Sequence, residues 1–221
     1  AKSQSEDIWV AFRAVQLDQT KETNWNKQLG VNHYLKKRIG EAVPHFPDEN
    51  KLGSVLYIED YATTGLSYTG EEHVEDTKFY RFFFGSGDNE DQSGTGGSFG
   101  YGKGVYTENS SIRTIVAYSC SEEDGVARKR IFGITRTKKY VFNSRKYSGY
   151  IYHGIPAEDN DGRTKSEPIE GADADRLAEN LGFTLRKDDE TGTSIAVVGL
   201  ESDPNKFLAE IKKETEIYWW K

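Results

Sequence analysis

The amino-acid sequence predicts an α+β fold, and three observations support this class. Stretches of β-branched and aromatic residues, such as Ile112–Ser119, are typical of strands. Most of these strands follow one another closely enough to pair as hairpins. Segments with apolar residues at helical spacing separate the strands, as in Pro204–Trp220. The length of 221 residues fits a single domain spanning 1–221.

The N-terminal part of the chain predicts two strands around a helical region. Ile8–Leu17 is rich in β-branched and aromatic residues and predicts a buried strand. Thr20–Gly40 carries spaced apolar residues, which predicts helical segments with a break at Gly30. Val55–Asp60 predicts a short apolar strand that ends in two acidic residues.

A long segment, Tyr61–Gly102, follows this strand and consists mostly of Gly, Ser, Thr and acidic residues. Loops of this length inside compact domains are usually functional or disordered. We therefore interpret the segment as a mobile lid. One apolar cluster, Phe79–Phe84, interrupts it, and two interpretations stay open: an anchor for the lid, or ordinary core.

The second half of the chain begins with a predicted hairpin. Ile112–Ser119 and Arg128–Thr135 are its strands, and the turn falls at Ser121–Gly125. The remaining expected elements are short strands at Tyr140–Phe142 and Tyr147–Tyr152, a polar loop at Glu158–Gly171, a helix at Ala172–Leu181, a strand at Thr193–Gly199 and an amphipathic helix at Pro204–Trp220.

Composition restricts the class of partner. The formal net charge is −7, whereas nucleic-acid-binding domains usually have a basic face, so nucleic acid is not indicated as a partner. The one cysteine, Cys120, excludes an internal disulfide and favours a reducing compartment. No apolar run approaches the ~20 residues that span a bilayer, and no secretion signal opens the chain. We expect a cytoplasmic protein without a membrane partner.

The glycine-rich run Gly96–Gly104 is the most informative stretch of the sequence. Glycines let the backbone approach a ligand closely and adopt positive φ angles. Consecutive amide groups can then point inward and hold phosphate oxygens. The N-terminus of a helix beginning near Lys103 would add positive potential at the same place. The ammonium group of Lys103 would add a full positive charge.

A P-loop is an alternative interpretation of this run, because Gly97, Gly102 and Lys103 have the spacing of that motif. Two features count against it. Gly104 stands where a Ser or Thr should contact magnesium. The preceding residues, Ser93–Gly96, do not have the pattern of a buried strand. A flexible Gly/Ser loop without a ligand is the other alternative.

Three separated motifs, taken together, resemble those of the GHKL ATPases: Ile58–Leu66 (IEDYATTGL), Gly97–Gly102 (GSFGYG) and Gly192–Ser194 (GTS). This superfamily includes gyrase-type topoisomerases, large heat-shock chaperones, histidine kinases and MutL. The resemblance is strongest to a group of bacterial GHKL proteins, and it extends over Ile8–Trp220. It implies the Bergerat fold, an α/β sandwich with helices on one face of a mixed, mostly antiparallel sheet. It also implies ATP and Mg²⁺ as ligands.

The resemblance assigns roles to individual residues. Asp60 matches the aspartate that accepts a hydrogen bond from the exocyclic amine of adenine, and Gly65 matches the glycine beside the base. Thr193 matches the threonine whose hydroxyl helps to fix that aspartate and a water on the adenine. A phosphate contact by Lys103 is our own inference from its position. The expected nucleotide-binding residues are Asp60, Gly65, Gly97, Ser98, Phe99, Gly100, Tyr101, Gly102, Lys103 and Thr193.

The sequence also departs from the family pattern. Ala62 and Thr64 stand where the first motif commonly has glycines, and Tyr61 stands where Asn is frequent. The family's first box, a helix with an acidic base and a magnesium-binding Asn, should precede the strand at Ile8–Leu17, and we do not find it. The catalytic residues are therefore unassigned, and no metal ligand is predicted.

These observations lead to one main expectation and two alternatives. We expect ATP binding here and ATP hydrolysis in the complete protein, with lid closure driving association with a second copy or a downstream domain. The first alternative is a non-catalytic interaction module whose nucleotide site has decayed. The second is a β module rich in Tyr and Trp that binds carbohydrate or protein, which would leave the spacing of the three motifs as coincidence.

Overall fold

The computed structural model describes residues 7–48, 51–68, 77–85, 102–158, 161–162 and 164–218. The helices are α1 (Gln19–Leu29), the π-helical turn η1 (Val31–Leu35), α2 (Lys36–Ile39), α3 (Lys78–Phe83), α4 (Gly102–Glu108), α5 (Gly171–Leu181) and α6 (Pro204–Tyr218). The strands are β1 (Trp9–Gln16), β2 (Ser54–Tyr61), β3 (Ser110–Glu123), β4 (Val126–Arg136), β5 (Tyr140–Phe142), β6 (Arg145–Tyr147), β7 (Tyr150–His153), β8 (Ile155–Glu158), β9 (Thr164–Glu167), β10 (Ile169–Glu170) and β11 (Gly192–Leu200).

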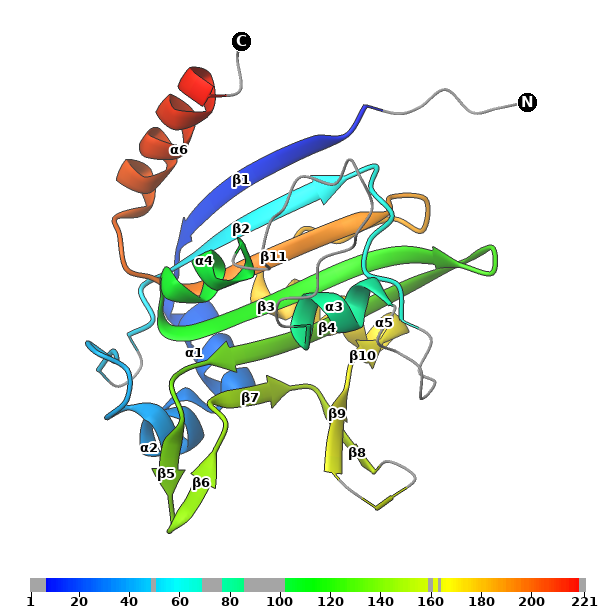
Figure 1. The fold of residues 1–221 in the computed structure, drawn as a ribbon. Coiled ribbons are helices and arrows are strands. Elements are labelled where there is room, and N and C mark those ends of the chain that lie inside the picture. Colours follow the sequence, from blue (N-terminus) through cyan, green and yellow to red (C-terminus); the bar gives the residue numbers. More distant parts are fainter. Residues whose placement is uncertain are drawn as a thin grey trace.

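One seven-stranded sheet dominates the molecule, with strand order β1-β2-β11-β3-β4-β10 and β7 also paired to β4 (Figure 1). This arrangement confirms the predicted α+β class. Every strand pair within the described residues is antiparallel, so the parallel component of the expected mixed sheet is not found there. The hairpin of β3 and β4 forms as predicted, and it turns at Asp124 and Gly125.

Local sequence explains where the first helix begins and ends. The side chain of Asp18 caps α1 by accepting a hydrogen bond from the backbone N–H of Lys21 at 2.8 Å. Gly30 ends the helix with φ of 60°, a left-handed conformation that glycine adopts without a steric penalty. The predicted break at Gly30 is therefore confirmed, and helical structure resumes in η1 and α2.

Helices cover both faces of the sheet, which corrects the expectation that they lie on one face. The larger core cluster joins α1, α2 and α5 to one face, which we call the helix face. On the opposite face a second cluster contains Phe79 and Phe83 of α3, with Tyr106 of α4 and Phe207 of α6 packed against it. The cluster Phe79–Phe84 therefore forms a helix whose buried rings belong to the core. Strands that are buried at every position, such as β11, need cover on both sides.

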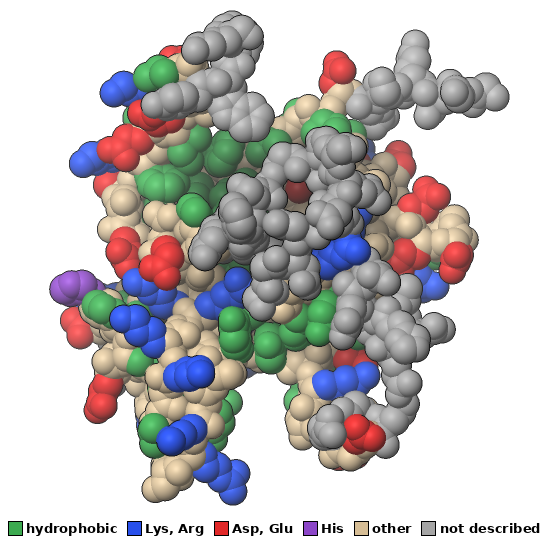
Figure 2. Space-filling view, in the orientation of Figure 1, with side chains coloured by type: hydrophobic (Ala, Val, Ile, Leu, Met, Phe, Trp, Pro, Cys, Tyr) green, Lys and Arg blue, Asp and Glu red, His purple; other side chains and the backbone are tan. Residues whose placement is uncertain are grey.

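The first strand differs from its prediction. β1 forms where Ile8–Leu17 predicted it, but it is an edge strand of the sheet and much of it is exposed. Val10 and Phe12 retain 52% and 42% of their accessible surface. Figure 2 views the face opposite the helix face and shows hydrophobic side chains gathered at the surface between α6 and the centre of the view. An apolar run predicts a strand, but it does not tell a central strand from an edge.

A smaller correction concerns the segment Glu158–Gly171, expected to be a polar loop. It contains β9 and β10, and β9 pairs with β8 as an antiparallel ribbon. Backbone hydrogen bonds build this ribbon from polar residues such as Thr164 and Lys165, so the usual apolar signal of a strand is absent from the sequence.

Candidate functional site

A row of polar side chains crosses the sheet on the face opposite the helix face. Strand register aligns Thr193 with Ser119, Ser119 with Arg130, and Arg130 with Glu170. Asp60 joins the row through its bond to Thr193. The next row on the same face is apolar: Ile58, Ile195, Ala117 and Phe132. Since side chains two apart share a face, this sheet face changes abruptly from apolar core to polar at one level. We call Asp60, Thr193, Ser119, Arg130 and Glu170 the polar row.

Asp60, which the sequence singled out, lies at one end of this row near the end of β2. Its Oδ1 accepts a hydrogen bond from the backbone N–H of Thr193 at 3.0 Å and another from the hydroxyl of Thr63. Within the described part of the chain, Oδ2 receives no hydrogen bond. The carboxylate is therefore fixed through one oxygen, while the other oxygen is available to a donor group of a ligand.

Gly65 lies beside the same site, in a left-handed backbone conformation that favours glycine. Its φ is +65°, and an added Cβ would overlap the carbonyl oxygen of Cys120. The next residue, Leu66, donates its backbone N–H to Ser119 Oγ at 2.8 Å. The structure thus brings three sequence-predicted residues, Asp60, Gly65 and Thr193, to one place, although Thr193 is far from the other two in sequence.

The departure at Ala62 has a structural counterpart. Ala62 has φ of 58°, in the left-handed region where glycine is favoured. The backbone at this position therefore has a conformation that a glycine would adopt without strain. Thr64, the other departure, accepts a hydrogen bond from the ammonium group of Lys78 at the start of α3.

The glycine-rich run is only partly within the described structure. The predicted binding residues Gly97, Ser98, Phe99, Gly100 and Tyr101 lie outside the described residues, as does the side chain of Lys103. Helix α4 begins at Gly102, one residue before Lys103. Tyr106 of α4 packs against the apolar cluster of the Asp60 face, so this helix lies on that face of the sheet. Burial and, second, the negative charge of Asp60 raise the pKa of the Tyr106 phenol.

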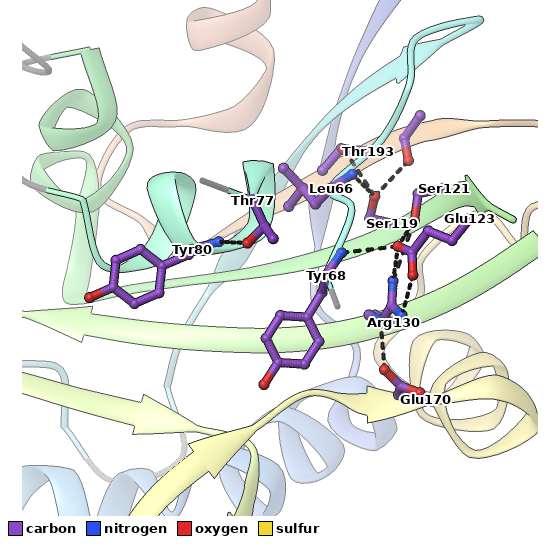
Figure 3. A network of polar contacts seen from close by, with 11 residues as sticks. Leu66, Tyr68, Thr77, Tyr80, Ser119, Ser121, Glu123, Arg130, Glu170 and Thr193 are labelled. Carbon is purple, nitrogen blue, oxygen red and sulfur yellow. Dashed lines mark hydrogen bonds and ion pairs between the residues drawn. The ribbon is translucent and has the colours of Figure 1, made fainter. Parts of the chain in front are cut away.

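At the other end of the row, Arg130 forms a charged cluster with two carboxylates (Figure 3). Its Nη2 donates to Glu123 Oε2 at 2.8 Å and its Nε to Glu170 Oε1 at 2.5 Å. Burial alone would raise the pKa of Glu123, but bonds from Arg130, the Tyr68 N–H and Ser121 hold it below its ordinary value. The cluster borders a cleft of about 870 Å³, of which Tyr68 forms part of the wall. Three strand spacings of ~4.8 Å place Arg130 roughly 14 Å from Asp60.

Several residues of the site were not predicted. Ser119 ends the predicted strand, and Ser121 and Glu123, which fall in the predicted turn, continue β3 with period two. This polar alternation is the signal that could have placed them on one face. Arg186 gave no sequence signal. Its Nη2 donates to the Asp60 backbone oxygen at 2.6 Å and to Ser194 Oγ at 3.0 Å, and its guanidinium lies 4.5 Å from the Tyr61 ring centroid. Arg186 thus supports the end of β2 from the helix face.

The described residues do not provide a fitted metal site. No group of three or more His, Cys, Asp or Glu side chains among them could hold an ion. A search of the described helices also finds none with the length and apolar character needed to cross a membrane.

Comparisons with known proteins add no assignment. No protein-family model matches the chain, and no curated protein or solved structure matches it. The function must therefore be argued from the residues of the polar row.

Proposed function

We propose that this chain is an ATP-binding module of the Bergerat type, with Asp60 recognising the adenine. In the complete, cytoplasmic protein, ATP binds with Mg²⁺ and is hydrolysed. Closure of a lid over the nucleotide then drives association with a second copy or a further domain. The proposal rests on the resemblance of three sequence motifs and on the geometry around Asp60.

One observation carries most of this proposal: Asp60 Oδ1 is held by Thr193 while Oδ2 has no partner among the described residues. Asp60 is partly buried, and a carboxylate oxygen that receives no hydrogen bond can accept one from a ligand. The exocyclic amine of adenine is such a donor, whereas guanine offers a carbonyl oxygen at the corresponding position. The geometry therefore favours ATP over GTP.

The surroundings of Asp60 support the same conclusion. The apolar residues Ile58 and Ile195 form the next row beside Asp60 on the same face of the sheet. Tyr106 places α4, and with it the last glycine of the run, on this face. The chain can thus bring backbone amides of the glycine run toward the phosphates of a nucleotide whose base lies at Asp60.

The proposal is tested by calorimetric titration of Mg-ATP and Mg-GTP into the wild-type chain and into Asp60→Asn. An asparagine keeps the acceptor for the Thr193 N–H but replaces Oδ2 with an amide donor, so the fold is preserved while adenine recognition is lost. A hydrogen bond to a charged group contributes about 1.5–3 kcal/mol, so ATP affinity should fall roughly tenfold to a hundredfold.

The matched control is Asp124→Asn, which makes the same change in charge at the exposed turn of the β3–β4 hairpin. It should bind ATP like the wild type. Equal ATP affinity of Asp60→Asn and the wild type would refute adenine recognition by Asp60. A folded wild-type chain without saturable ATP binding would favour an interaction module with a decayed site.

A further inference from the structure

The formal net charge of −7 is unevenly distributed along the chain. Residues 23–40 contain four Lys and Arg residues and no Asp or Glu, and residues 125–157 contain eight Lys and Arg residues and again no Asp or Glu. Two stretches of this kind in an acidic chain form a local basic surface where the fold places them side by side.

The two stretches meet where α2 contacts β5 (Figure 1). Arg38 of α2 links them. Its Nε donates to the Tyr140 hydroxyl at 3.2 Å, and its guanidinium lies 4.5 Å from the ring centroid of Tyr147 and 5.2 Å from that of Phe142. A guanidinium over aromatic rings is a favourable contact. Arg38 therefore holds the ribbon of β5 and β6 against α2.

Six further basic side chains belong to α2, to β6 and to the two residues just before β5. Within the part of the chain that the structure describes, none of the six forms an ion pair or a side-chain hydrogen bond. All are exposed except Lys36, which is partly buried. Figure 2 shows Lys and Arg side chains gathered over this region, at the lower left. We call these residues the basic lobe: Lys36, Lys37, Lys138, Lys139, Arg145 and Lys146.

The lack of partners distinguishes the basic lobe from basic residues elsewhere in the molecule. Lys129 of β4 is paired with Asp175 and Asp188, and Arg130 with Glu123. In the basic lobe the like charges repel one another, and a polyanion would supply the missing counter-charge. Nucleic acids gain further from such binding, because each phosphate that is neutralised releases condensed counterions.

The ribbon of β5 and β6 has a shape that suits the major groove of DNA. It is a two-stranded sheet separate from the main sheet, and it projects from the body of the molecule (Figure 1). Tyr140 and Tyr147 pair and stack on the side of Arg38, so Val141 and its partner Lys146 point away from it to solvent. The major groove of B-form DNA is about 12 Å wide and admits a two-stranded β-ribbon.

The tip of the ribbon favours a nucleic acid over an anionic membrane. Asn143 and Ser144 form its two-residue turn, with φ of 47° and 61°. Membrane-binding surfaces insert large apolar side chains among their cations. Here the Tyr140 and Tyr147 rings lie beside Arg38, and the turn carries only side chains that form hydrogen bonds.

We propose that the basic lobe binds double-stranded DNA through its phosphates, with the ribbon of β5 and β6 in the major groove. The basic lobe and the end of β2 that carries Asp60 lie at opposite corners of the molecule (Figure 1). The inference is therefore independent of the proposed ATP binding and adds a second binding surface to the chain.

The test measures binding of a fluorescein-labelled DNA duplex by fluorescence anisotropy over a range of salt concentrations. The triple variant Lys138→Gln/Lys139→Gln/Lys146→Gln removes three charges from exposed positions, so its fold should be unchanged. Its affinity for the duplex should fall roughly a hundredfold at physiological salt. The slope of log K against log salt concentration should become shallower by about 3, one for each lost phosphate contact.

The matched control is Lys206→Gln/Lys212→Gln/Lys213→Gln, which makes the same change in charge at exposed positions of α6. It should bind the duplex like the wild type. Equal affinities of the two triple variants would overturn the inference, as would a folded wild type that does not bind the duplex at low salt.

Two further probes test the choice of ligand. Single-stranded DNA of the same length has no major groove, and vesicles of phosphatidylserine and phosphatidylcholine present lipid phosphates. The duplex should bind more tightly than either, and equal or tighter binding of one of them would overturn the assignment to double-stranded DNA. Asp60→Asn should bind the duplex like the wild type, so DNA binding and ATP binding can fail separately.

Discussion

The two faces of the sheet use their polar side chains differently, and neighbouring residues of β2 make the contrast clear. Glu59 and Tyr57 point to the helix face. Tyr57 donates to the carbonyl oxygen of Leu181 at the end of α5 at 2.6 Å, and Glu59 lies 3.4 Å from Arg13. Asp60 points to the other face, where its carboxylate bonds to Thr193 and Thr63.

On the helix face, polar groups of the sheet bond to the helical layer and so fasten it. Tyr118 follows the same pattern, donating to Asp175 Oδ1 of α5 at 2.5 Å. On the Asp60 face the polar row bonds to itself and, through Ser119, to the backbone of Leu66, while the neighbouring Glu123 accepts from the backbone N–H of Tyr68. The difference indicates that polar groups on the helix face fasten the helical layer to the sheet, while the polar row shapes a surface on the opposite face. Changes on the helix face should thus alter stability alone.

The largest effect on stability and ATP binding is expected for Gly65→Ala, which tests the face that carries the polar row. An alanine at φ +65° is strained, and its Cβ would overlap the Cys120 carbonyl oxygen. Strain and overpacking each cost about 1–3 kcal/mol, so the free energy of unfolding should fall by roughly 3 kcal/mol. Movement of Leu66 away from Ser119 should also weaken ATP binding more than tenfold. Urea unfolding and ATP titration measure the two effects.

Gly125→Ala is the control that separates strain from overlap. Gly125 has φ of +74° in the β3–β4 turn, and an added Cβ there meets nothing within 4 Å. It should cost only about 1 kcal/mol for the left-handed conformation and leave ATP binding unchanged. Equal losses in the two variants would show that the contact between Gly65 and Cys120 has no role.

The fold could be predicted from sequence wherever a residue's local pattern decided the outcome. The hairpin of β3 and β4 and the helix break at Gly30 follow from apolar stretches and a glycine cap. The position of β1 at the sheet edge could not be predicted, because strand order depends on pairing between distant segments. The ribbon of β8 and β9 was missed because backbone pairing builds it from polar residues.

The candidate site shows the same division. Asp60, Gly65 and Thr193 were predicted from motifs, and the structure brings them together. Ser119 and Arg130 were missed, because their importance comes from register across neighbouring strands. A sequence shows alternation within one strand, but it does not show which residue of the next strand lies opposite. The residues Gly97–Tyr101 lie outside the described structure, so their phosphate contacts stay a prediction.

A second prediction uses pH to test the helix face. Nε2 of His153 lies 2.7 Å from Oγ1 of Thr135. Burial lowers the pKa of the His153 imidazole from 6.5 to about 4. The unfolded chain therefore binds a proton near pH 6.5, whereas the folded chain does so only near pH 4. Between these values the unfolded state holds more protons, so the free energy of unfolding should fall by up to roughly 3 kcal/mol as pH is lowered.

Urea unfolding of wild type and His153→Gln between pH 7 and pH 4.5 measures this effect. Glutamine can keep a bond to Thr135 but does not titrate, so the variant should lose much of the decline in stability. The exposed His33→Gln should retain the wild-type profile. If His153→Gln declines as steeply as His33→Gln, the imidazole is not the group responsible.

The smallest effect is expected for Tyr57→Phe, which tests the comparison most directly because Tyr57 lies three residues before Asp60. Burial raises the pKa of the Tyr57 phenol to about 12, so the group is a neutral donor to Leu181 O at neutral pH. Loss of this buried hydrogen bond should lower the free energy of unfolding by about 1 kcal/mol. ATP affinity and the preference over GTP should not change, because the bond lies on the helix face. A change in nucleotide affinity would contradict the separation of roles between the two faces. It would show that the contact between Tyr57 and α5 affects nucleotide binding at Asp60 through β2.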